Sequence, residues 1–349
     1  MPPGFRSVVT IRHVARAAGV SVATVSRVYN HSVLVREETR KQVEAAGTRL
    51  GYAPHGTARS LITSKTSTLG VLLPDLYGEF FSEVIRGIDQ AAQASGYHLL
   101  VSSSHDDMRA LTAVLRSMRG RVDGLVVMSP DVESPVALSH LPEQFPVVFL
   151  NCPAEGADSI TIANRDGARA MVSHLVDLGH RDIAMIKGPR RNYDAVERLA
   201  GYRLALRERQ VRWSAQLEVA GDFSERSGYR AVRELLGRSP RPTAIFAAND
   251  SMAIGALGAL REGGIAVPGA MAVAGFDDIP MASYVSPALT SVHVDISALG
   301  ERAAVRLLGA IRRSPGDQPF QEVLPAALVV RESCGAAIPE VKPPWRKSV

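Results

Sequence analysis

The chain has 349 residues, of which 46% are hydrophobic and 21% are charged, as in soluble globular proteins. This length favours two or three domains, and no apolar run approaches the ~20 residues that a membrane span requires. The first residues lack the apolar stretch of a secretory signal, so we expect a cytoplasmic protein. Neither cysteine, Cys152 or Cys334, has metal-ligand spacing around it, and we assign them no role.

The positive charge is concentrated in the first fifth of the chain. Residues 1–65 contain ten Lys or Arg and three Glu, a formal charge of +7. The remainder contains 30 basic and 32 acidic residues, a formal charge of −2. A basic, solvated tail is one interpretation, but the segment is regularly patterned, and a polyanion is the natural partner of such a segment.

A short helix and a glycine turn are predicted at the start of this segment. Apolar residues spaced i, i+3, i+4 and i+7 form one stripe, which comprises Ile11, Val14, Ala15 and Ala18. Gly19 ends this helix, as a glycine beyond the last periodic residue does. Ser21 can then cap a second helix that runs to about Asn30.

The second helix has two distinct faces. Val25 and Val28 lie on one face and can pack inward. The opposite face offers two small apolar groups, a hydroxyl and an arginine, which belong to Val22, Ala23, Ser26 and Arg27. A third helix follows with an inward stripe of Thr39, Val43, Ala46 and Leu50. Two helices joined by a tight glycine turn are typical of the helix-turn-helix, whose second helix enters the major groove of DNA.

These segments resemble the N-terminal signature of the LacI/GalR (lactose-repressor) family. Residues 10–11, 14–15, 18–21 and 24–30 match that signature, and residues 50–54 and 58–61 match the link into the family's hinge helix. The resemblance continues to about Arg331. It implies an all-α helix-turn-helix domain with its hinge at residues 1–66, followed by an α/β two-lobed sensor domain like a periplasmic binding protein. It also implies a transcription regulator, and we expect a repressor.

The resemblance implies which residues contact double-stranded operator DNA: Thr10, Ser21, Val22, Ala23, Ser26, Arg27, Asn30, Tyr52, Ala58 and Leu61. Val22 and Ala23 suit thymine methyl groups. Arg27 matches a base-reading arginine that can bond guanine, with a phosphate contact as the alternative. Leu61 matches the leucine that the family wedges into the minor groove, which kinks the duplex.

Three positions depart from the family pattern. His13 stands where the family has an acid three residues after the capping Thr10, so we expect a capping box to be lost. Arg36 replaces the usual serine cap of the third helix, although Glu37 and Glu38 still complement its positive end. In the hinge, His55 replaces an asparagine, and Gly56 weakens a helix by ~1 kcal/mol. We therefore expect the hinge helix to form only on DNA.

Short apolar runs alternate with helical stretches from Ser67 onward. The runs predicted to be strands are residues 69–73, 98–101, 124–128, 147–150, 183–186, 244–248 and 272–275. Because these runs are apolar on both faces, they are typical of parallel sheets covered by helices. The pattern predicts a doubly wound α/β arrangement that is too long for one sheet.

The resemblance implies two lobes joined by three crossovers. We expect the first lobe at 67–162 and 293–321, the second at 163–292 and 322–338, and a disordered tail at 339–349. The tail has no leucine heptads, so no C-terminal tetramerising coil is predicted. A homodimer is the expected assembly.

Ligands of open α/β sheets bind beyond the carboxyl ends of the strands. Matching positions of the family support the same region, and the residues expected to face an effector are Asp75, Phe80, Asn192, Arg198, Phe223, Asn249 and Asp277. Asn192, and Asp194 in the same loop, have weaker support. Loop capping and core packing are the alternatives for each residue. We expect Asp250 to be structural, and Phe81 to belong to the core because it shares a helical stripe with Val84 and Ile88.

An aspartate, an asparagine and an arginine that converge with two aromatic rings suit a polyol. A sugar or sugar derivative is therefore the favoured effector, with a nucleobase second. Val294 stands where some relatives have a polar group, so the identity of the ligand stays open.

Two other functions are less compatible with the sequence. A solute-binding protein of a transport system shares the two-lobed fold, but it needs an export signal and no helix-turn-helix. An enzyme is disfavoured because the chain has no phosphate loop, nucleophile elbow, HExxH motif or strand-linked GxGxxG motif. We therefore expect no catalytic residues, no metal and no cofactor.

Overall fold

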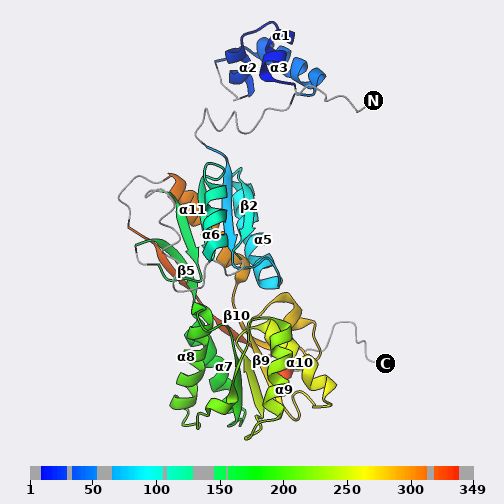
Figure 1. Cartoon of the computed structure of the whole chain (residues 1–349), viewed down its shortest axis with the longest axis vertical. Coiled ribbons are helices and arrows are strands. Elements are labelled where there is room, and N and C mark those ends of the chain that lie inside the picture. The colour runs from blue at the N-terminus through cyan, green and yellow to red at the C-terminus, as the bar shows by residue number, and fades with distance from the viewer. Residues whose placement is uncertain are drawn as a thin grey trace, which may run out of the picture. The chain divides into compact units, whose positions relative to one another are not determined.

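The computed structural model describes residues 9–29, 34–52, 65–104, 108–128, 145–154, 156–312 and 318–337 (Figure 1). Residues 1–67 form one compact unit and residues 68–349 form another. The predicted hinge residues His55, Gly56, Ala58 and Leu61 and the expected tail at 339–349 lie outside the described residues. No helix in the described part of the chain is long and apolar enough to cross a membrane.

The N-terminal unit is a three-helix arrangement of α1 (Ile11–Ala17), α2 (Val22–Tyr29) and α3 (Glu37–Leu50). Its core is made of small apolar side chains that are at most 6% exposed: Val14, Ala15, Ala18, Val25, Val28, Val43 and Ala46. Gly19 adopts the left-handed φ of +62° that the tight turn requires. Ser21 Oγ accepts a hydrogen bond from the Thr24 N–H at 3.1 Å and so caps α2. The predicted helix-turn-helix is confirmed.

The expectation that the capping box of α1 is lost is wrong. Nδ1 of His13 accepts a hydrogen bond from the backbone N–H of Thr10 at 3.1 Å. An unprotonated imidazole nitrogen is a hydrogen-bond acceptor and can therefore replace the usual carboxylate. Arg36 makes no side-chain cap bond to α3, as expected, and Glu37 and Glu38 occupy the first turn of that helix.

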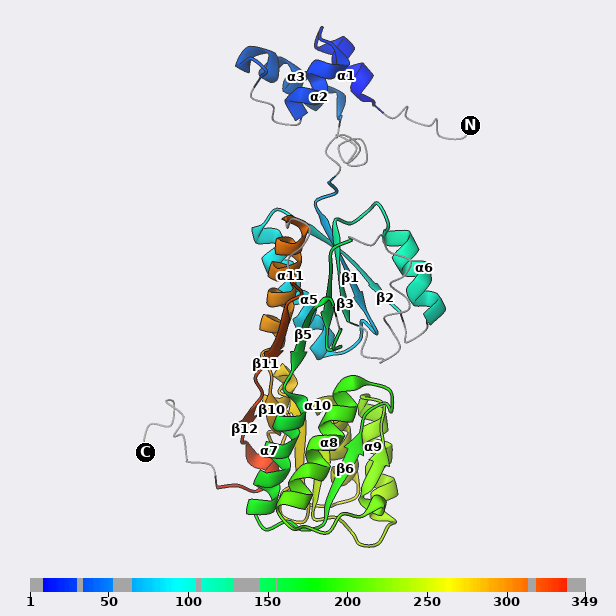
Figure 2. The ribbon, with the colours of Figure 1, turned by 90° about the vertical axis from the view of Figure 1, so that its left-hand side faces the viewer.

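The first sheet of the C-terminal unit contains β1 (Thr68–Leu73), β2 (His98–Ser103), β3 (Gly124–Met128), β4 (Val147–Leu150), β5 (Asp158–Ile162) and β11 (Gln321–Leu324). The strands are parallel in the order β11-β5-β4-β3-β1-β2. Helices α5 (Glu79–Ala94) and α11 (Ile296–Arg312) cover one face, and α6 (Met108–Met118) covers the other (Figure 2). Leu73 accordingly packs in the cluster that contains Val84 of α5, whereas Leu72 packs with Leu115 of α6. This sheet and its helices are the first lobe.

The second sheet contains β6 (Ile183–Lys187), β7 (Glu218–Ala220), β8 (Ala244–Ala247), β9 (Ala272–Asp277), β10 (Thr290–His293) and β12 (Ala327–Val329). Its order is β12-β10-β9-β8-β6-β7, with β12 antiparallel to β10. Helices α7 (Asn164–Asp177) and α8 (Tyr193–Glu208) lie on one face, and α9 (Glu225–Leu236) and α10 (Asp250–Glu262) lie on the other (Figure 1). This sheet and its helices are the second lobe. Short 3-10 turns lie at Ala215–Leu217, Pro280–Ser283 and Glu332–Cys334.

The chain crosses between the lobes three times, as the resemblance implied: between β5 and α7, between β10 and α11, and between β11 and β12. The last crossover lies later than expected, because Gln321–Leu324 pairs with β5 in the first sheet. The boundary expected after residue 321 is therefore corrected to residues 325–326. Similarly, His293 belongs to β10 of the second sheet and not to the first lobe.

All seven predicted strands are present, but β5, β7, β10, β11 and β12 were not predicted. Strand β5 was not predicted because it begins with an acid, Asp158, that is buried in the fold. Asp158 accepts hydrogen bonds from Arg306 Nε at 2.8 Å and Nη2 at 2.9 Å and from the Phe320 N–H at 2.8 Å. Partners more than 140 residues away make this polar residue compatible with a core strand, and no local pattern reveals them.

Candidate functional site

Helix α2 presents an exposed face that fits the predicted DNA-reading surface. Val22 is 42% exposed, and Ala23 and Arg27 are exposed, whereas Ser26 is half-buried. On the opposite side of the helix, Val25 is fully buried in the core. A small apolar pair and a guanidinium therefore stand together on one accessible surface.

Other residues predicted to contact DNA also serve the local fold. Thr10 and Ser21 are exposed, but the backbone N–H of Thr10 and the hydroxyl of Ser21 take part in helix caps. The half-buried Tyr52 packs edge-on against Tyr29 with ring centroids 5.5 Å apart, and burial raises the pKa of both phenols. The structure thus gives Tyr52 a packing role, and its DNA contact stays a prediction. The structural description does not include Asn30, Ala58 and Leu61.

A cavity of about 330 Å³ lies between the two lobes of the C-terminal unit. Its walls come from loops at the carboxyl ends of β1 and β4 in the first lobe and of β6, β7, β8 and β9 in the second. All seven residues predicted to face an effector line it: Asp75, Phe80, Asn192, Arg198, Phe223, Asn249 and Asp277. The predicted residues are therefore brought together in one place.

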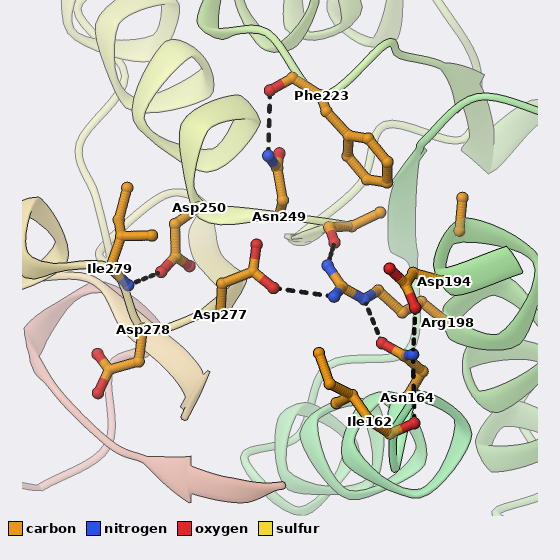
Figure 3. A network of polar contacts seen from close by, with 12 residues as sticks. Ile162, Asn164, Asp194, Arg198, Phe223, Asn249, Asp250, Asp277, Asp278 and Ile279 are labelled. Carbon is orange, nitrogen blue, oxygen red and sulfur yellow. Dashed lines mark hydrogen bonds and ion pairs between the residues drawn. The ribbon is translucent and has the colours of Figure 1, made fainter. Parts of the chain in front are cut away.

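Arg198 of α8 is the centre of the polar network in this cavity (Figure 3). Its Nε donates to Asn164 Oδ1 at 2.8 Å, its Nη1 donates to the Ala248 carbonyl at 2.6 Å, and its Nη2 lies 2.8 Å from Asp277 Oδ1. The guanidinium also stacks on Phe276, 3.8 Å from the ring centroid. The residue is only 2% exposed, so its position is rigidly determined by the protein itself.

Two buried carboxylates surround this guanidinium. Asp277 ends β9 with an unusual φ of +105°, and burial raises its pKa to about 6 even though Arg198 opposes the shift. Asp194 accepts a hydrogen bond from Asn164 Nδ2 at 2.7 Å, and burial raises its pKa as well. Figure 3 shows the resulting chain of contacts from Asp277 through Arg198 and Asn164 to Asp194. Arg198 therefore holds Asp277 directly and Asp194 through Asn164.

The two predicted asparagines act as helix caps as well as cavity walls. Asn249 Oδ1 accepts from the Met252 N–H at 3.0 Å, and its Nδ2 donates to the Phe223 carbonyl at 3.0 Å. Asn192 Oδ1 accepts from the Ala195 N–H at 2.9 Å. Loop capping, which was the alternative to ligand binding, thus occurs at the same residues that line the cavity.

Aromatic rings line the cavity from both lobes. Phe80 meets Phe81 edge-on with ring centroids 5.7 Å apart, and Phe223 extends from the second lobe with a φ of +72°. As expected, the half-buried ring of Phe81 packs against the core, and it also lines the cavity. Asp75 shapes the adjacent turn by accepting from the Leu76 N–H at 2.7 Å.

Sequence reasoning missed two asparagines of this site. Asn164 bridges Arg198 and Asp194, but it follows β5, a strand that was not predicted. Asn151 follows β4 directly and lines the cavity with 1% exposure, and its side chain opposes the rise in the pKa of Asp194 that burial causes. The search for polar residues after predicted strands could have found Asn151. Its Oδ1 has no hydrogen-bond partner within the described part of the chain.

Two nearby residues lie outside the cavity wall. Asp250 is fully buried and accepts from the Ile279 N–H at 2.9 Å and from Ser291 Oγ at 2.6 Å, which fits the structural role expected for it. Burial and the neighbouring Asp277 raise its pKa well above the usual range. Val294 is 1% exposed and belongs to the core. Among the described residues, no cluster of His, Cys, Asp and Glu could hold a metal ion.

The fold and these two sites define a class of protein, a helix-turn-helix regulator with a two-lobed domain that binds a small molecule. Family models agree with this description: residues 10–55 match the bacterial regulatory proteins of the lacI family, and residues 172–334 match a periplasmic binding protein-like domain. The chain belongs to the LacI family. It is a transcription regulator and not an enzyme.

Individual relatives span nearly the whole chain. The HTH-type transcriptional repressor PurR of Escherichia fergusonii is 35% identical in an alignment of 337 residues that covers 90% of this chain and 98% of the relative. The lac repressor dimer bound to operator and the anti-inducer ONPF is 34% identical, with a TM-score of 0.85 over 94% of this chain and 99% of that chain. The complex of the transcriptional regulator CelR with cellobiose is 33% identical, with a TM-score of 0.70 over 93% and 99%.

Proposed function

We propose that this protein is a dimeric repressor whose affinity for operator DNA is controlled by a sugar or sugar derivative bound between its two lobes. The observation that carries the proposal is the interlobe cavity, whose walls include Phe80 from the first lobe and Arg198, Phe223, Asn249 and Asp277 from the second. A ligand that contacts both lobes has an affinity that depends on their separation. Ligand binding and DNA binding are then coupled reciprocally, typically by about 1–3 kcal/mol.

The donors and acceptors of the cavity suit hydroxyl groups. Arg198 has five N–H groups, of which the protein uses three, so two remain for a ligand. Asp277 supplies carboxylate oxygens, and Phe80 and Phe223 can cover the apolar face of a pyranose or furanose ring. The similarity to a regulator in complex with cellobiose supports the same ligand class.

The DNA-binding half of the proposal rests on α2. Val22, Ala23 and Arg27 are accessible together, and the unit that contains them carries the excess positive charge of the chain. In a dimer, two such helices would read the halves of a pseudo-palindromic operator in the major groove. Asn30, Ala58 and Leu61 are proposed to add contacts from the end of α2 and from the hinge. Because its target is chromosomal DNA, we propose that the protein works in the bacterial cytoplasm.

Calorimetry on the full-length protein tests the ligand assignment. The probes are ribose, glucose, galactose and cellobiose, with adenine and hypoxanthine as nucleobase competitors. Asp277→Asn keeps an oxygen for Arg198 but removes the charge, and it should weaken the binding of a sugar at least about tenfold. Asp166→Asn is the matched control, because the Asp166 side chain is 77% exposed on α7.

An operator-binding assay on the same variants completes the test. The Asp277 variant should bind operator without sugar as the natural protein does, and it should no longer respond to sugar. Binding of a nucleobase but of no sugar would overturn the ligand assignment. Unchanged sugar affinity in the Asp277 variant would move the effector away from this cavity.

A further inference from the structure

We propose that the cavity selects against negative charge, so that an uncharged sugar binds in preference to its phosphorylated or carboxylated derivative. This inference rests on the proposed function, because it concerns the ligand of the same cavity. The proposed function allows any sugar or sugar derivative, whereas this inference restricts the effector to uncharged ones. The charge of the cavity wall and the groups that already occupy the helix ends at the cavity both favour an uncharged ligand.

Carboxylates dominate the charged groups of the cavity wall. Six acids line it: Asp75, Glu79, Asp194, Asp222, Glu225 and Asp277. Only two cations, Arg191 and Arg198, line it with them, which leaves a formal charge of −4 on the wall. A phosphate brought into this space meets like charges in a region of reduced dielectric, where such repulsion is stronger than in water.

The buried cation of the cavity is already occupied. Arg198 interacts with the Asp277 carboxylate at 2.8 Å, with the Asn164 amide oxygen at 2.8 Å and with the Ala248 carbonyl at 2.6 Å. Its two remaining N–H groups can bond hydroxyls, but its charge is balanced by neighbouring acids. The other cation, Arg191, is exposed in the loop before α8.

Four helices begin at the cavity, and their positive ends would ordinarily attract an anion. Here the first turn of each helix carries an acid of the chain itself: Glu79 in α5, Asp194 in α8, Glu225 in α9 and Asp250 in α10. The N-terminal N–H groups are also occupied, because Asn192, Ser224 and Asn249 cap α8, α9 and α10 with their side-chain oxygens. At α8, α9 and α10, an acid and a side-chain cap therefore already occupy the positive end of the helix, and at α5, which has no side-chain cap, the Glu79 carboxylate alone opposes an anion.

Two of these acids remain available to oppose an anionic ligand. Glu225 has no hydrogen-bond or ion-pair partner among the described residues, and Glu79 accepts one hydrogen bond, from the backbone N–H of Met281 at 2.9 Å. No cation in the described part of the chain forms an ion pair with either carboxylate. Burial also raises the pKa of Asp194 and Asp277, which indicates that this environment already disfavours negative charge.

Calorimetry with matched probes tests the inference on the full-length protein. The pairs are ribose with ribose 5-phosphate, and glucose with glucose 6-phosphate and with gluconate. The uncharged member of the pair that binds should bind at least about tenfold more tightly than its anionic partner. In the glucose series, 6-O-methylglucose carries a neutral group where the phosphate stands, so it separates the effect of charge from that of bulk.

A double variant sharpens the test. Glu79→Gln with Glu225→Gln removes two charges and keeps the shape of the wall. The ratio of the affinity for the sugar to the affinity for its phosphate should therefore fall several-fold. Glu234→Gln is the matched control, because this half-exposed acid of α9 does not line the cavity and pairs with Arg238. If this affinity ratio is the same in the double variant as in the natural protein, the two carboxylates do not cause the selection against negative charge.

The outcomes separate this inference from the function on which it rests. If the phosphorylated member binds as tightly as the sugar or more tightly, the charge selection is overturned, while a sugar effector stands as long as Asp277→Asn weakens binding. If no member of any pair binds, and galactose and cellobiose do not bind either, the sugar effector itself is overturned, and this inference is overturned with it.

Discussion

The two surfaces that we propose for DNA binding and for effector binding differ in how much of their chemistry the fold already uses. On α2, the side chains of Val22, Ala23 and Arg27 project from a core that is complete without them. In the interlobe cavity, Arg198 and Asn249 are themselves parts of the fold, through an ion pair, a helix cap and backbone hydrogen bonds. We therefore expect binding and stability to be separable at the proposed DNA surface and coupled at the proposed effector site.

The strongest test of this coupling is Arg198→Ala. The change leaves Asp194 and Asp277 buried without their cation, which should cost about 3–5 kcal/mol of the free energy of unfolding. Urea unfolding followed by tryptophan fluorescence measures this cost, because Trp213 lies in the second lobe, where its Nε1 donates a hydrogen bond to Glu218. Arg165→Ala is the control: this side chain is 54% exposed and pairs with Glu197 at the surface, so its loss should cost less than about 1 kcal/mol. If Arg198→Ala also costs less than about 1 kcal/mol of the free energy of unfolding, the Arg198–Asp277 pair does not stabilise the fold and serves ligand binding only.

Coupling through packing is tested by Gly188→Ala. A Cβ at Gly188 would lie 2.5 Å from the Phe223 ring and 2.8 Å from Ala195 Cβ, so the ring must move. Overpacking of this kind costs about 1–3 kcal/mol, and we expect effector affinity to fall together with thermal stability. Gly258→Ala in α10 has nothing within 4 Å of the added carbon and should be neutral or slightly stabilising. Unchanged calorimetric affinity in the Gly188 variant would show that the Phe223 ring does not contact the ligand.

At the proposed DNA surface, we expect a substitution to lower binding affinity without lowering stability. Arg27→Ala should leave the unfolding free energy unchanged, cost about 1–3 kcal/mol of specific operator affinity, and relax one base preference in each half-site. Binding to a library of operator variants, compared with binding to non-specific DNA, measures both effects. An equal loss of affinity for every sequence would make Arg27 a phosphate contact.

The two surfaces also differ in how much of them can be predicted from the sequence. The helix-turn-helix is encoded by local periodicity, so its helices and its exposed face could be predicted from the spacing of residues such as Val25 and Val28. The cavity residues could be predicted because parallel strands deliver their following loops to one edge. What local patterns do not contain is the partner of each polar group.

Three residues illustrate that limit. Asn164 lies next to Arg198 in the fold but 34 positions away in the chain, and it follows a strand hidden by the buried Asp158. Asp158 itself depends on Arg306, 148 positions away. His13 illustrates the same limit at short range. The sequence pattern predicts the loss of a cap where histidine replaces an acid, but the imidazole nitrogen accepts the same hydrogen bond.

The smallest predicted effect concerns pH and also distinguishes the two surfaces. Burial raises the pKa of Asp277 from 3.8 to about 6, so this carboxyl is mostly ionised at pH 7.5 and mostly protonated at pH 5. The protonated form loses its attraction to Arg198 and one of its acceptor sites. Effector affinity should therefore be constant above about pH 7 and fall by up to about tenfold for each pH unit below 6.

Calorimetry with the bound sugar between pH 5 and pH 7.5 measures this dependence. The groups around Asp277 that also carry charge are Arg198, Asp194 and Asp250, and burial raises the pKa of both acids as well. For that reason the decisive comparison is Asp277→Asn, which cannot titrate at this position and should give a flatter profile at lower affinity. A profile that stays as steep in this variant would assign the titration to Asp194 or Asp250. An affinity that does not change with pH in the natural protein would mean that the ligand does not use the Asp277 carboxylate as an acceptor.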